Sequence, residues 1–87
     1  MTSQALAEIF ATRGGFAADG GRLVGTEDAE ATVFATLGNE SLVIDRVKSV
    51  EIDKEVIVIA TRKDLYVLAC ADVRAVRFSL AGAVTGY

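Results

Sequence analysis

The chain has 87 residues, enough for one small domain, and 52% of them are hydrophobic, which excludes a disordered composition. A net charge of −3 with scattered basic residues disfavours a nucleic-acid binder that relies on a basic cluster. Histidine is absent and cysteine occurs once, which excludes serine–histidine triads and zinc sites built on histidine or four thiolates. We therefore expect no enzyme, no metal and no cofactor.

The first element that the pattern predicts is a short helix over residues 2–13. Thr2 or Ser3 can cap its start, and Gly14 ends it. A helix of this length is marginal alone, so we expect its apolar stripe to pack on the rest of the domain. That stripe consists of Leu6, Ile9 and Phe10.

Residues 14–29 are rich in glycine and predict either a loop or a weak hairpin. Asp19 and Gly20 form a turn signal, and Phe16 and Leu23 are placed to pair across it. Neither the Gly-Lys-Ser/Thr ending of a P-loop nor a Gly-x-Gly-x-x-Gly pattern occurs here, so we do not expect this segment to hold phosphate.

Residues 30–79 predict an antiparallel meander because short turns join its strands. The apolar alternation of the second strand changes phase near Arg46 and Val47, which indicates a bulge or sharp bend. We expect a mainly β fold: a small five-stranded antiparallel barrel, or a strongly curled sheet, with a short N-terminal helix. We expect residues 80–87 to form a tail or a final strand. The expected strands are 30–37, 41–52, 55–62, 65–70 and 73–78.

The segment 56–59 contains four β-branched residues in succession, which places apolar groups on both faces of one strand. One small core covers one face, so we expect a second copy of the chain to cover the other. This pattern predicts a homo-oligomer. The residues expected in the core or the subunit interface are Val56, Ile57, Val58, Ile59, Tyr66, Val67, Leu68, Val76 and Phe78.

We expect a cytoplasmic location and no membrane association. The longest apolar run, 56–60, is far shorter than the roughly 20 residues of a spanning helix. The N-terminus lacks the basic and long apolar regions of a secretory signal. Cys70 lies in an apolar run and is expected to be a buried core residue rather than a redox group.

The order of elements resembles that of the Sm-like small β-barrels, which include the Hfq-type RNA chaperones. The matching segments are ATVFATLGNESLVI for the first strand and turn, EVIVIATRKD for the third strand, and LYVLACADVRAVRF for the last two. The resemblance implies a barrel whose fourth and fifth strands pair between neighbours to close a ring. The counterpart of the RNA-contacting motif runs from Tyr66 to Cys70 and has no basic or imidazole group. The glycine of the second strand is also missing.

Three functions follow as hypotheses. The favoured one is a non-enzymatic homo-oligomeric assembly or protein-interaction module, whose partner is a second copy or another protein. The alternative is an Sm-like RNA-binding protein, for which a ring would gather basic residues on one rim although nucleic acid is the less favoured partner. The third is a small-ligand-binding barrel. The candidate RNA contacts are Arg62, Lys63, Arg74 and Arg77.

Overall fold

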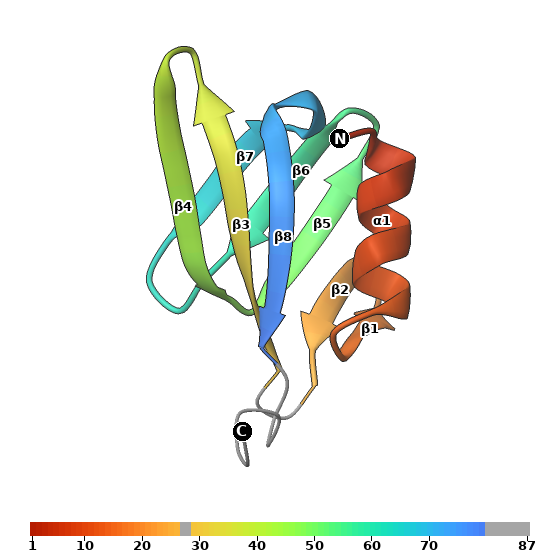
Figure 1. Ribbon diagram of the computed structural model, residues 1–87. Coiled ribbons are helices and arrows are strands. Elements are labelled where there is room, and N and C mark those ends of the chain that lie inside the picture. The colour runs from red at the N-terminus through yellow and green to blue at the C-terminus, as the bar shows by residue number, and fades with distance from the viewer. Residues whose placement is uncertain (27–28, 80–87) are drawn as a thin grey trace.

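A computed structural model describes residues 1–26 and 29–79 of the chain (Figure 1). The tail expected at 80–87 lies outside the described residues. The structure is mainly β with one short N-terminal helix, as predicted. Its elements are α1 (Ser3–Thr12), β1 (Phe16–Asp19), β2 (Arg22–Gly25), β3 (Glu30–Leu37), β4 (Glu40–Val47), β5 (Ser49–Asp53), β6 (Val56–Ala60), β7 (Leu65–Ala69), the 3-10 turn η1 (Cys70–Asp72) and β8 (Val73–Ser79).

Two antiparallel sheets face each other. One has the strand order β1-β2-β5-β6-β7 and the other the order β4-β3-β8 (Figure 1). The expected closed five-stranded barrel is wrong, because a closed barrel has no edge strands and here each sheet keeps two. The physical reason lies at η1: this turn carries the chain from β7 in one sheet to β8 in the other, where β8 pairs with β3.

The bend expected in the second strand is present at Arg46. Ala31 pairs with Val47 but Val33 pairs with Ile44, so β4 has one extra residue there, and Arg46 has a φ of 57°. An extra residue in the left-handed conformation bends a strand sharply. The single strand expected over 41–52 is consequently two strands, β4 and β5, in different sheets.

The segment expected to be a loop or weak hairpin is a hairpin. Asp19 pairs with Arg22 around a two-glycine turn, which agrees with the turn signal. The expected pair of Phe16 with Leu23 is wrong, because Phe16 lies opposite Gly25. The hairpin is stabilised by its neighbour, since β2 also pairs with β5 and so extends the larger sheet.

Helix α1 begins at a cap in which Thr2 Oγ1 accepts a hydrogen bond of 3.1 Å from the amide of Ala5. Leu6 and Phe10 are fully buried against the sheets. The Phe10 ring meets Phe16 at 5.2 Å and Phe78 at 5.4 Å between centroids, both edge to face. One aromatic cluster thereby joins the helix to both sheets.

Candidate functional site

The outer surface of β6 and β7 is apolar. Successive residues of a strand point to opposite faces, and Ile57, Ile59 and Leu68 point into the core. The residues between them point outward and form three cross-strand pairs. These pairs, which we call the apolar face, are Val56 with Ala69, Val58 with Val67 and Ala60 with Leu65.

Three of the five large hydrophobic residues that are exposed in the described chain belong to the apolar face. Leu65 is 66% exposed, Val67 62% and Val56 39%. The next strand, β5, continues this side of the sheet with Glu51 opposite Val58 and with Asp53 opposite Val56. The apolar face therefore reaches from an acidic border on β5 to the free edge of β7.

The edge of β7 has no charge, bulge or proline to protect it. Natural edge strands avoid pairing with other chains by means of charges, bulges, prolines or short length. Among the described strands, β4 has the bulge at Arg46, β8 carries Arg74 and Arg77, and β1 has only four residues. Strand β7 reads LYVLA, without a charge, and its pairing with β6 is regular. It is the edge most open to strand addition.

The other predicted core or interface residues face inward. Ile57 and Ile59 are fully buried, Leu68 is almost so, and Tyr66, Val76 and Phe78 are half-buried and pack against the core. The four-residue apolar run at 56–59 therefore divides as its alternation predicts, with two residues in the core and two on the outer surface. Of the outer two, Val56 is exposed and Val58 is half-buried in the part of the chain that is described.

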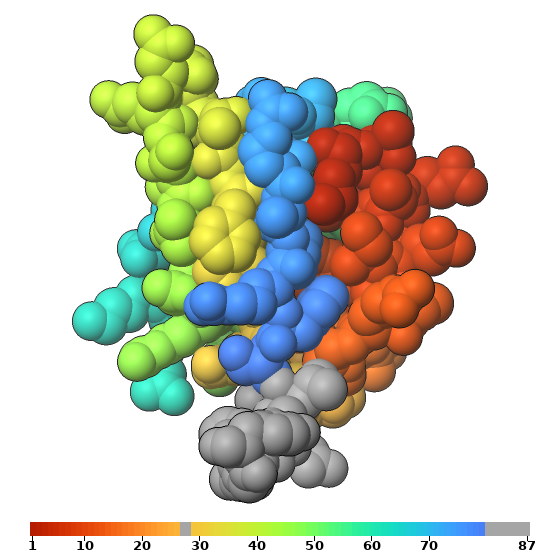
Figure 2. All heavy atoms as spheres, in the orientation of Figure 1, coloured from red at the N-terminus to blue at the C-terminus, as the bar shows by residue number. Residues whose placement is uncertain are grey.

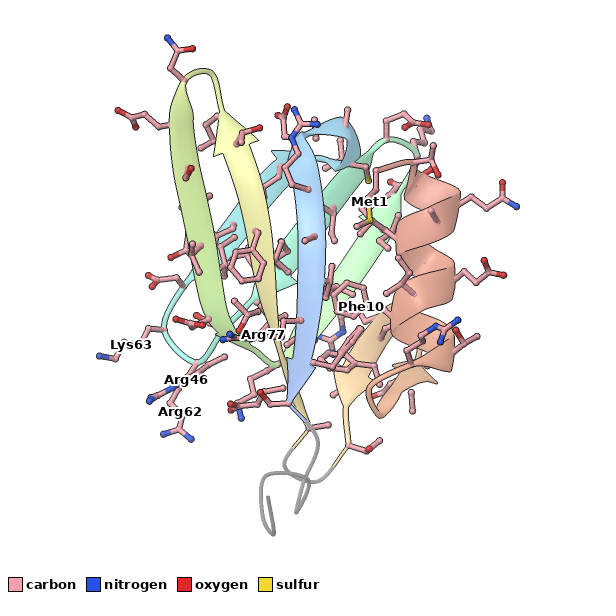
Figure 3. All side chains as sticks on the ribbon, in the orientation of Figure 1. Met1, Phe10, Arg46, Arg62, Lys63 and Arg77 are labelled. Atoms are coloured by element: carbon pink, nitrogen blue, oxygen red, sulfur yellow. The ribbon has the colours of Figure 1, made fainter. Side chains whose placement is uncertain are left out.

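The four candidate RNA contacts do not gather in one place on the chain. Arg62 and Lys63 lie in the loop between β6 and β7, and Arg77 lies near that end of the smaller sheet (Figure 3). Arg74 lies apart from them and donates a hydrogen bond of 3.1 Å to Thr36 Oγ1. Only the fold brings Arg62, Lys63 and Arg77 to the same end, because Arg77 lies 14 positions after Lys63 in the sequence.

Cys70 is fully buried in the turn η1 and its amide donates to the Glu55 carbonyl oxygen at 2.8 Å. Desolvation raises the pKa of its thiol above the ordinary value, and the charge of Glu55 raises it further. The nearby N-terminal amino group acts in the opposite direction. A buried thiol of raised pKa carries little thiolate near neutral pH and is a poor nucleophile.

Comparisons with protein families, curated proteins and solved structures found no match for this chain. The resemblance to the Sm-like proteins therefore stays a prediction. Within residues 1–26 and 29–79, no helix has the length and apolar character that crossing a bilayer demands.

Proposed function

We propose that this protein is a non-enzymatic interaction module whose subunits pair with one another along β7. The observation that carries the proposal is the unprotected edge of β7 continuous with the apolar face. An edge strand offers unpaired backbone N–H and C=O groups, and a second strand satisfies them. The apolar face supplies the hydrophobic contribution beside that edge.

A second copy of the chain is the occupant that fits best. A two-fold axis perpendicular to the larger sheet would place β7 antiparallel to the partner's β7 and join the two sheets into one. Strand β7 has no charged residue, so this self-pairing juxtaposes no like charges within the strand. On the joined sheet, Leu65 and Val67, which each expose more than half of their surface, would gain cross-strand neighbours from the partner, and such pairs contribute about 0.2–1 kcal/mol each.

The arrangement of α1 favours this dimer over a ring. A ring of the kind that the Sm-like resemblance implies needs the edge of β8 as well as that of β7. Helix α1 lies beside β8 (Figure 2). The N-terminal amino group of Met1, which precedes the helix, donates to the Val73 carbonyl oxygen at 2.8 Å, and Phe10 of the helix packs against Phe78, so this N-terminal segment contacts β8 near both of its ends. These contacts hinder strand addition at β8 and favour β7 as the pairing strand.

We also place this assembly in the cytoplasm. Cys70 is a free, buried cysteine, and nothing in the described chain requires an oxidising compartment. Stable disulfides are characteristic of secreted proteins, whereas reduced single cysteines are ordinary in the cytoplasm.

The test compares Val67→Lys with Val43→Lys. Both residues are valines on edge strands, and Val67 is 62% exposed and Val43 52% exposed. The two variants therefore change charge and strand propensity alike. Light scattering at micromolar concentration should give the wild type and Val43→Lys twice the 9.2 kDa of one chain. Val67→Lys should have the mass of one chain, since a lysine would face its own copy across the axis.

Amide hydrogen exchange is a second, independent measurement of the same pairing. In a dimer, the outward amides of β7 should exchange slowly in the wild type and rapidly in Val67→Lys, while those of β4 should not differ. A single-chain mass for the wild type would contradict the proposal. So would a dimer that Val43→Lys dissociates and Val67→Lys does not.

A further inference from the structure

The end of the sandwich where β4 bends and β6 turns into β7 contains an open hollow of about 560 Å³. Its size falls in the range of about 300–1,000 Å³ that small-molecule sites occupy. Figure 3 shows Arg46, Arg62 and Lys63 extending from this end of the molecule. The residues that line the hollow are Glu30, Asp45, Arg46, Lys48, Thr61, Arg62, Lys63 and Asp64.

Positive charge is concentrated there in a chain that is acidic as a whole. Together with an adjoining smaller hollow that includes Arg77, the hollow is lined by five of the nine basic residues and only three of the twelve acidic ones. The remainder of the chain has four basic and nine acidic residues. The fold therefore separates charge that the sequence scatters, and this end of the molecule attracts anions.

Two of the acidic groups at the hollow already have partners. Lys48 Nζ forms an ion pair with Glu30 Oε2. Asp45 Oδ1 accepts a hydrogen bond of 3.0 Å from Thr32 Oγ1. Within the described residues, Arg46, Arg62 and Lys63 form no ion pair, and all three are exposed. Their donors remain available to a ligand.

The backbone fixes the positions from which these three side chains extend. The loop before β7 is closed by the Thr61 amide, which donates to the Asp64 carbonyl oxygen at 2.9 Å, and by the Asp64 amide, which donates to Thr61 Oγ1 at 3.0 Å. Arg62 and Lys63 are the central residues of that closed loop. Arg46 extends from the bulge in β4 and lies beside Arg62 (Figure 3).

The conformation of Arg46 is unfavourable for any residue with a side chain. Its φ of 57° lies in the left-handed region, where glycine is the least strained residue. Glycine would suit this bulge position better than arginine. The arginine adds no packing there, because its side chain is exposed. It does supply a guanidinium group to the hollow, and such groups bind phosphate oxygens in a bidentate manner.

We infer that the hollow binds a small anion with at least two phosphate groups. Arg46, Arg62 and Lys63 would hold it. A long polyanion fits less well, because a strand that continued beyond the hollow would meet a net negative surface. Among the described residues that line the hollow, none is aromatic, so they offer no ring on which a base could stack. The site is open to solvent, so its affinity should fall as salt rises.

The test uses Arg46→Gly with Lys54→Gly as its control. Lys54 has the same left-handed backbone, with a φ of 58°, and the same charge, but it lies in the turn at the opposite end of β6. Both variants relieve a strained residue and remove one positive charge, so both should melt no lower than the wild type. Only Arg46→Gly removes a donor from the hollow.

Pyrophosphate is titrated into the full chain at low salt, and amide chemical shifts report the contact. We expect saturable shifts at residues 45–48 and 61–64, an affinity at least tenfold lower in Arg46→Gly, and an affinity within twofold of the wild type in Lys54→Gly. Repeating the titration in Val67→Lys separates this site from the proposed pairing of β7, because the hollow belongs to one chain. The affinity in that variant should be unchanged.

Adenosine diphosphate is titrated alongside, to distinguish a nucleotide from a simple diphosphate. Tighter binding of either one supports the site and identifies its source. Equal losses in Arg46→Gly and Lys54→Gly would overturn the inference, since they would indicate a general charge effect. Amide chemical-shift changes spread over the whole surface would also overturn the inference. A ten-nucleotide single strand that bound more tightly than both small ligands would replace it with a nucleic-acid site.

Discussion

The ring of Phe78 lies where a Cβ atom on Gly14 would be, so the turn after α1 closes directly on β8. Gly14 also has a φ of 74°, which favours glycine in its own right. The ring cannot move aside easily, because it packs edge to face against Phe10 and Phe16. This contact joins the helix, the first hairpin and the smaller sheet.

Gly14→Ala should therefore lower the free energy of unfolding by about 1–3 kcal/mol, through the backbone strain together with the displaced ring. Gly20→Ala is the matched control, since Gly20 has a φ of 65° and nothing within 4 Å of the added methyl group. In Gly20→Ala the free energy of unfolding should fall only by the backbone contribution, about 1 kcal/mol. Urea denaturation measures both. Equal losses would show that the Phe78 ring does not restrict position 14.

Ile59→Ala tests the inward half of the apolar run. Ile59 is fully buried, and truncation of a buried isoleucine typically costs about 2–5 kcal/mol. In a domain of this size that corresponds to a melting temperature lower by roughly 10 °C or more. Val43→Ala, at an exposed position, should change stability by no more than about 0.5 kcal/mol. A melting curve of Ile59→Ala that matches the wild type would show that β6 is not part of the core.

The buried thiol of Cys70 predicts a loss of stability in alkali. Its folded pKa lies above the ordinary value of 9.0, so the unfolded chain loses the proton first as pH rises. The free energy of unfolding should therefore fall above about pH 9, and this part of the fall should be absent in Cys70→Ala. Urea midpoints at pH 8 and pH 10 for the two proteins measure the difference. Identical pH dependence would contradict it.

Short single-stranded RNA should bind weakly near physiological salt. Arg62, Lys63 and Arg77 share one end of the molecule but Arg74 does not, so few phosphates can be met at once. Fluorescence anisotropy should show a shallow, salt-sensitive rise that does not saturate, and it should be shallower still when Arg62 and Lys63 become alanine. Tight, saturable binding that this double variant abolishes would favour the Sm-like RNA-binding function instead.

The sequence by itself determined the local features of this protein. The helix start at Thr2, the turn after Asp19, the bend at Arg46 and the inward direction of Ile57 and Ile59 all follow from residues a few positions apart. Caps, turns and strand alternation depend on neighbours along the chain, and the pattern of side chains reveals them without any knowledge of the fold.

The tertiary structure decided which distant segments meet. The pairing of β8 with β3, and hence two open sheets instead of a barrel, depends on how η1 carries the chain across the core. The same crossing leaves β7 as a free edge. The hollow likewise brings Arg46 and Lys48 beside Arg62 and Lys63, two pairs that look isolated in the sequence. Strand partners and charge clusters arise from contacts between residues far apart in the chain, and such contacts follow from the packing of the whole molecule and not from local pattern.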